Sequence, residues 1–194
     1  MGVTSAPMAQ LIQFEEHALA RLRERLGAAE EANQDLIAFA RGHSGAVASI
    51  HAAVLAAMEA DCVPTLLHVI TQEWPLILGI DAVAVGLIDG DESLRADGNG
   101  IQPVDAPFLQ RQLEQLAPVE MRTVERGHPL FGPACELIRA EALVRIERDG
   151  GTPLGVIALG QRAALPLDAR HGSELLLFLG RSLATIIGRW HAEP

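Results

Sequence analysis

The chain has 194 residues, of which 49% are hydrophobic and 21% are charged, so it can bury a core and is not predicted to be disordered as a whole. Its formal net charge of −10 argues against binding to nucleic acid, because phosphate backbones require clustered cations. Two cysteines, Cys62 and Cys135, are too few for a disulfide framework or a structural zinc site.

The N-terminus shows no signal peptide, because residues 1–10 lack a basic stretch followed by an apolar one. We interpret residues 1–10 as a disordered N-terminus. The longest apolar run, "LLLFLG", is far shorter than the ~20 residues that a membrane span needs. These observations predict a cytoplasmic protein that is not embedded in a membrane.

Residues 11–60 are predicted to be helical, with apolar side chains at heptad spacing. The line is narrow, which favours a coiled-coil seam over the wider stripe of a helix that packs on its own core. Asn33 occupies an a position, where it can pair with Asn33 of a parallel partner. Two glycines in 41–46 predict a kink or a break, after which 46–60 continues the register. The predicted homodimer interface consists of Leu19, Leu22, Leu26, Ala29, Asn33 and Leu36.

A second helix is predicted behind Asp61, a plausible N-cap. Its apolar residues recur every three or four positions up to Gly79, and Pro75 should bend it. A strand follows over 82–88, where the bulky side chains Val83, Val85 and Leu87 alternate with Ala82, Ala84 and Gly86. The small-residue face would let a helix or a ligand approach the sheet closely.

The remaining chain alternates short elements and turns. It predicts a short strand near Leu94, a loop over 97–107, a short helix over 107–116 and a strand over 119–124. A Gly- and Pro-rich segment follows, and then a hairpin turns around residues 149–151 before a final amphipathic helix over 173–190. Strands in hairpins with helices at both ends indicate an α+β domain over 61–194, with an antiparallel sheet and helices on one face.

The final stretch, "AEALVRIERDGGTPLGVIALGQRAALPLDARHGSELLLFLGRSLATII", resembles the end of a GAF domain, a small-ligand sensor fold. Together with the N-terminal half, "LRERLGAAEEANQDLIAFARGHSGAVASI" onwards, it is similar to the bacterial family called domain of unknown function 484. That family pairs a coiled-coil helix with a GAF-like domain. The resemblance implies a fold but brings no ligand, and neither the cyclic-nucleotide signature nor the Cys-His bilin attachment pair of other GAF domains is visible.

Candidate chemistry is sparse. His128 and Cys135 lie seven residues apart, and a neighbouring imidazole can activate a thiol, but we favour a packed Cys135 because no third group or oxyanion site is evident. The histidines are too scattered for a metal pair. Arg122 and Arg145 lie on predicted strands and could face an anionic ligand, although solvated pairing with Glu120 or Glu147 is favoured.

These patterns predict no catalytic residue, no metal and no cofactor. We expect a non-enzymatic GAF-like sensor that binds an unidentified small molecule between the sheet and residues 119–138 and signals through its dimer helices. The alternative is a dimeric scaffold that binds a partner protein without a small ligand. The candidate pocket residues are Arg122, Leu130, Phe131, Cys135 and Arg145.

Overall fold

The computed structural model describes residues 25–27, 30, 42, 44–90, 92–148, 151, 153–164 and 169–190. The chain divides into two compact units, Met1–Gly45 and Ala46–Pro194. The described residues of the first unit are helical, and Leu26 is 60% exposed there. Residues 1–10 and the other predicted interface residues lie outside the described part of the chain, namely Leu19, Leu22, Ala29, Asn33 and Leu36.

The second unit begins with a helical segment over 46–58, which the sequence assigned to the dimerisation helix. Ile50, Ala53 and Ala57 are buried in the core of this unit, and the indole Nε1 of Trp74 donates a hydrogen bond to the Ala53 carbonyl over 3.0 Å. Ile50 and Ala57 occupy d positions of the heptad pattern. In this stretch, therefore, the heptad line packs against the chain's own core, and the domain extends back to Ala46.

The predicted helix over 61–79 is present as three joined pieces: α2 (Val63–His68), the π-helical η1 (Val69–Glu73) and α3 (Trp74–Leu78). Pro75 cannot donate a backbone hydrogen bond, and the wider π-helical turn ends two residues before it in the chain. Asp61 is not the N-cap: Cys62 takes that position, and the Asp61 carboxylate accepts from the Thr65 hydroxyl at 3.1 Å. Gly79 ends α3 with a φ of 65°, as a left-handed C-terminal glycine should.

A six-stranded antiparallel sheet has the strand order β3-β2-β1-β6-β5-β4. Its strands are β1 (Ala82–Asp89), β2 (Glu92–Asp97), β3 (Gly100–Pro103), β4 (Val119–Thr123), β5 (Ala140–Ile146) and β6 (Gly155–Gln161). The predicted hairpin is confirmed, since β5 pairs with β6 up to Ile146 opposite Gly155. The prediction of a loop over 97–107 is wrong in part, because it contains β3, an edge strand whose four residues are all exposed and show no apolar alternation.

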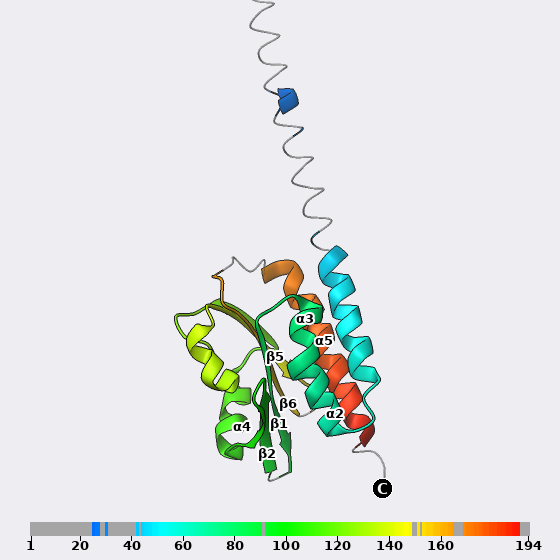
Figure 1. Cartoon of the computed structure of the whole chain (residues 1–194), viewed down its shortest axis with the longest axis vertical. Coiled ribbons are helices and arrows are strands. Elements are labelled where there is room, and N and C mark those ends of the chain that lie inside the picture. Colours follow the sequence, from blue (N-terminus) through cyan, green and yellow to red (C-terminus); the bar gives the residue numbers. More distant parts are fainter. Residues whose placement is uncertain are drawn as a thin grey trace, which may run out of the picture. The chain divides into compact units, whose positions relative to one another are not determined.

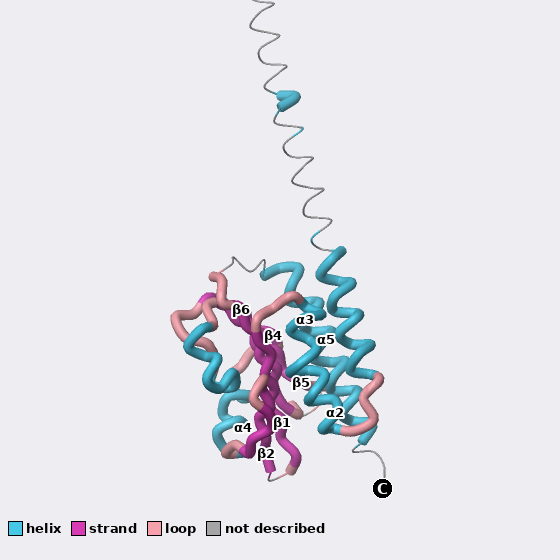
Figure 2. The backbone as a smooth tube through the Cα atoms, viewed as in Figure 1, coloured by secondary structure: helices cyan, strands magenta, loops and turns pink. Residues whose placement is uncertain are grey.

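Helices cover both faces of this sheet, as Figures 1 and 2 show. The helical segment 46–58, α2, α3 and α5 (Ala169–Trp190) pack on the face that carries Val83, Val85 and Leu87. The helix α4 (Ala106–Gln115) and the 3-10 segment η2 (Pro129–Leu137) pack on the other. The predicted α+β architecture is confirmed, but the placement of all helices on one face is corrected by α4 and η2.

Candidate functional site

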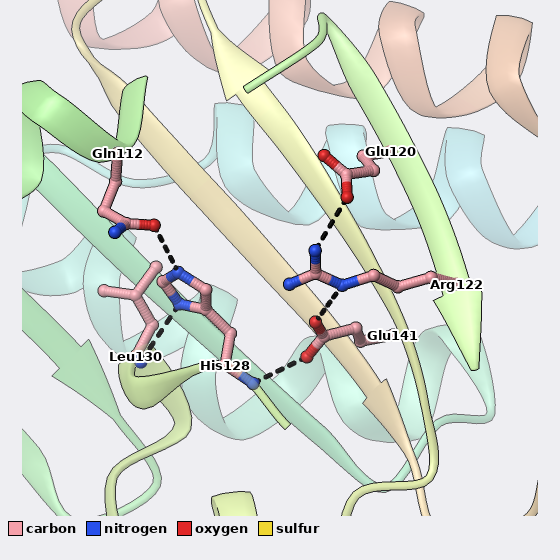
Figure 3. Close-up of polar contacts among 6 residues, drawn as sticks. All are labelled: Gln112, Glu120, Arg122, His128, Leu130 and Glu141. Carbon is pink, nitrogen blue, oxygen red and sulfur yellow. Dashed lines mark hydrogen bonds and ion pairs between the residues drawn. The ribbon is translucent and has the colours of Figure 1, made fainter. Parts of the chain in front are cut away.

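A buried carboxylate organises the segment between β4 and β5 (Figure 3). Glu141 lies on β5, and its side chain is 0% exposed. Its Oε1 accepts a hydrogen bond from Arg122 Nε over 2.8 Å, and its Oε2 accepts from the backbone N–H of His128 over 2.6 Å. Arg122 also donates from Nη1 to Glu120 over 2.7 Å. Both oxygens of the buried carboxylate therefore have partners, as a buried charge requires.

His128 extends this network to two helical segments. Its Nδ1 accepts a hydrogen bond from the backbone N–H of Leu130 over 3.2 Å, which caps η2. We therefore assign the proton of the neutral ring to Nε2, which lies 3.2 Å from the Gln112 Oε1 on α4 and donates to it. Burial lowers the pKa of His128, and the nearby Arg122 adds to this, whereas Glu141 and Glu120 act in the opposite direction.

The pKa of Arg122 shifts the other way. Burial alone would lower it, but the hydrogen bond and charge of Glu141, with a further contribution from Glu120, raise the pKa above its ordinary value. At neutral pH the network therefore holds a charged guanidinium and a neutral imidazole next to Glu141. This arrangement fastens the loop before η2 to the sheet.

His128 and Cys135 do not form the Cys/His nucleophile pair that was considered from the sequence. Both ring nitrogens of His128 are engaged, by the Leu130 N–H and by Gln112. Cys135 is 6% exposed and belongs to the apolar cluster between the sheet and η2. The pKa of the nearby Arg126 guanidinium is raised by Cys135 and Glu136, and Arg126 forms an ion pair with Glu136 over 2.8 Å.

The predicted ligand region between the sheet and residues 119–138 is filled by side chains. Leu130 and Phe131, together with Cys135, are buried there. The small-residue face of β1 explains how they fit: a Cβ placed on Gly86 would come within 3.0 Å of Leu109 and 3.1 Å of Leu130. The space that the sequence left for a helix or a ligand is thus taken by α4 and η2.

The two predicted arginines have separate partners. Arg122 joins Glu141 and Glu120, whereas Arg145 pairs with Glu147 at 2.5 Å and donates to the Leu116 carbonyl over 3.2 Å. The partners Glu120 and Glu147 are those that the sequence suggested, but the pairs are not simply solvated: Arg122 also bonds to the buried Glu141, and the Arg145 side chain is only 23% exposed. Sequence reasoning missed Glu141 and Gln112; the available signal for Glu141 was an acid within the apolar run "AEALVRI".

A cavity lies on the opposite face of the sheet. It measures about 420 Å³, is partly open to solvent, and is bordered by the segment 46–58, the end of α3, the first turns of α5 and strands β4–β6. Met121, Ala140 and Ala142 form part of its floor, so the cavity backs directly onto the strand residues that hold the network. No feature of the sequence pointed to this space.

The described residues form neither a metal-binding cluster nor a membrane-spanning helix. No group of three or more His, Cys, Asp or Glu residues in this part of the chain is placed to hold a metal ion. None of the described helices has the length and apolar character needed to cross a membrane.

Solved structures of GAF domains have a similar fold. The GAF domain of a phosphoenolpyruvate-protein phosphotransferase from Coxiella burnetii matches with a TM-score of 0.54 and 14% identity, over 77% of this chain and 96% of that one. A bacteriophytochrome from R. palustris matches at 0.51 and 16%, over 73% and 37% of the two chains. The chromophore-binding domain of a Stigmatella aurantiaca bacteriophytochrome matches at 0.50 and 15%, over 72% and 59%.

This chain thus spans less than two thirds of either bacteriophytochrome chain. At such identities the likeness establishes the GAF fold and nothing about ligands. No curated protein matches the sequence. A family model described as "Protein of unknown function, DUF484" does match residues 4–192, and the chain belongs to this family.

Proposed function

We propose that this protein is a non-enzymatic, cytoplasmic regulatory module of the GAF fold, which binds a small molecule and passes the resulting change to its helices. The observation that carries the proposal is the position of the segment 46–58. It follows the predicted coiled coil in sequence, and it is part of the domain core through Ile50, Ala53 and the Trp74–Ala53 hydrogen bond. A change in the core would therefore act directly on the helix that leads to the dimer seam.

The dimer is the second part of the proposal. Two copies would meet along Leu19, Leu22, Leu26, Ala29, Asn33 and Leu36. Apolar side chains on the outer surface of the domain helices support a wider contact: Leu55 is 61% exposed, Met58 is 52% exposed and Phe178 of α5 is 45% exposed. Phe178 lies edge-on to His51, with ring centroids 6.0 Å apart, so the two helices present one continuous surface.

A thermal-shift screen against nucleotides, amino acids and other metabolites tests binding, and the exposed Cys62 provides a readout of signalling. A nitroxide attached to Cys62 lies just beyond the segment 46–58, and Cys135 is buried, so labelling should be selective. We expect a stabilising compound to change the distribution of distances between the two labels in a dimer, as measured by pulsed electron paramagnetic resonance. A compound that raises the melting temperature but leaves these distances unchanged would contradict signalling through the helices.

The second candidate function is a dimeric scaffold that holds a partner protein. The filled space around Leu130 and Phe131 favours it, because no ligand is needed there to complete the core. Purification from the native host separates the two functions. A stoichiometric protein partner without a bound small molecule would favour the scaffold.

A further inference from the structure

We propose that the cavity beneath the segment 46–58 and α5 is a binding site for a neutral, largely hydrocarbon molecule with one hydrogen-bonding end. The site lies on the face of the sheet opposite to η2 and the Glu141 network, so it is distinct from the region where the sequence predicted a ligand. It is also the face on which the proposed signalling helices pack.

The shape of the cavity follows from the size of the side chains around it. Ile50, Leu175 and Leu176 approach from the helices, whereas the sheet offers the small side chains of Ala140 and Ala142. Larger residues at these two strand positions would fill the gap between α5 and the sheet. The space remains because β5 is built with alanines here.

The size suits a molecule larger than a single ring. An apolar protein cavity of roughly 150 Å³ can bind benzene, and ligand pockets commonly measure about 300–1,000 Å³. The present cavity of about 420 Å³ would therefore accommodate two or three fused or linked rings, or an acyl chain of medium length.

The charges around the cavity select against an anion. Its described lining contains neither Arg nor His, and the only ionisable residue in it is Glu141. The Glu141 carboxylate is held by Arg122 and by the His128 N–H. The His128 ring in turn contacts Gln112 and Leu130, which lie on the opposite face of the sheet from the cavity. A carboxylate or phosphate seated against this apolar lining would lose hydration without gaining a cation from the described residues, which is unfavourable.

Two polar side chains can serve the hydrogen-bonding end of the molecule. Ser49 on the segment 46–58 and Gln161 at the end of β6 both line the cavity. A hydroxyl, ketone or amide group could bond to either of them. The rest of the lining favours hydrocarbon.

This binding site deepens the proposed sensor function, and its effect on signalling rests on that function. A molecule in this cavity would contact the segment 46–58 and α5 at the same time, through Ile50 and Leu175. Its binding would therefore favour one spacing of the two helices over another. The binding itself can be tested without any assumption about signalling.

The test uses a pair of fluorescent probes on the full chain. Phenylnaphthylamine is neutral, and anilinonaphthalenesulfonate has the same rings with a sulfonate added. We expect the neutral probe to bind with one site per chain and at least about tenfold more tightly than the anion, because the described part of the lining offers no cation. Ser49→Leu should weaken the neutral probe about tenfold or more by filling the cavity. Ala52→Leu, on the exposed side of the same helix, is the matched control and should leave binding unchanged.

Ala142→Leu fills the cavity from the sheet and provides a second variant if Ser49→Leu disturbs the helix. Neutral-probe binding that both variants leave intact would overturn the proposal, as would tighter binding of the anion. Binding that appears only in a dissociated monomer would also overturn it, since a second copy would then occupy the space. A different result would contradict the sensor function alone: the neutral probe binds as expected, but the distances between labels at Cys62 do not change.

Discussion

Glu141 shows how one buried charge can hold a segment that has little regular structure. The residues between β4 and β5 form a bend and a short 3-10 segment, and Glu141 fastens their start through the His128 N–H. Gly127 also donates a backbone hydrogen bond to the Cys135 carbonyl over 2.8 Å, so the loop is closed on itself. The carboxylate thus replaces hydrogen bonds that a helix or strand would have supplied.

Glu141→Gln should destabilise the domain by about 3 kcal/mol. The amide of Gln can present only one acceptor oxygen, so either the Arg122 Nε or the buried His128 N–H loses its partner. Arg122 is 43% exposed and can turn to water, so the amide oxygen should keep the His128 N–H. The cost then comes from the buried amide NH2, which points at the former position of the Arg122 Nε and has no acceptor there. Urea unfolding followed by circular dichroism measures the change. Glu120→Gln is the control: its pair with Arg122 is at the surface, so its loss should cost under about 1 kcal/mol. Equal losses for the two variants would contradict a special role for Glu141.

His128 should make the stability of the domain depend on pH. Burial lowers the pKa of His128 in the folded state, so the unfolded chain binds a proton at a higher pH than the folded one does. The contribution of His128 to the free energy of unfolding should therefore be constant above the ordinary pKa of about 6.5 and should fall as the pH drops below it. The fall continues until the folded pKa is reached.

His128→Asn separates this titration from the cap. The side-chain oxygen of Asn can accept the Leu130 N–H in place of Nδ1, but it does not titrate. Between pH 7 and 5 the free energy of unfolding of this variant should decline less steeply than that of the unmodified chain. A variant with the same slope would show that other groups cause the pH dependence.

At the scale of elements, α5 approaches β5 closely at a glycine. A Cβ added to Gly180 would lie 2.4 Å from the carbonyl oxygen of Arg145 and 2.9 Å from a methyl group of Val144. The backbone of a central strand cannot move without disturbing its neighbours. Gly180→Ala should therefore destabilise the domain by about 2 kcal/mol or more, even though Ala is the better helix former.

Gly172→Ala on the same helix is the matched substitution. The nearest atoms to its added Cβ belong to Met121 and lie 3.5 Å away, an ordinary contact. This variant should be unchanged in stability or gain up to about 1 kcal/mol from helix propensity. Thermal unfolding of both variants checks the contrast, and a Gly180→Ala protein as stable as Gly172→Ala would refute the close packing of α5.

The strongly patterned elements were predictable from the sequence, and the reason is local. The hairpin of β5 and β6 has two β-rich runs on either side of a Gly-Gly pair in the sequence, and α5 has a long apolar stripe. The exposed β3 has neither signal. Its pairing with β2 places Leu94 opposite Pro103, and that contact depends on the turn between the strands more than on an apolar pattern.

The candidate site was less predictable because its contacts join residues far apart in sequence. Arg122 and Glu141 meet only because β4 and β5 pair in the register that sets them opposite each other. Gln112 reaches His128 from a helix that crosses the same face. The cavity depends on which side of the sheet each helix covers, and the sequence did not reveal that α4 packs on the face opposite to α5.

At the scale of the whole molecule, the heptad pattern contributes to the domain core and, in our proposal, also forms a dimer seam. In the segment 46–58 its d positions, Ile50 and Ala57, are buried in the domain core. The same spacing occurs between Leu19 and Leu36, where Asn33 occupies an a position. A polar a residue of this kind is typical of a parallel dimer seam, where it sets the register at a cost in stability.

Asn33→Leu should raise the stability of the dimer and loosen its choice of oligomeric state, because an apolar a position no longer excludes other arrangements. Gln34→Leu, one residue away and off the seam, is the matched control and should change neither property. Light scattering on the full chain should give a dimer for the unmodified protein and a mixture of larger species for Asn33→Leu, whereas a chain lacking residues 1–42 should be monomeric. A full-length monomer would refute the coiled-coil dimer, and Asn33→Leu indistinguishable from Gln34→Leu would place Asn33 outside the seam.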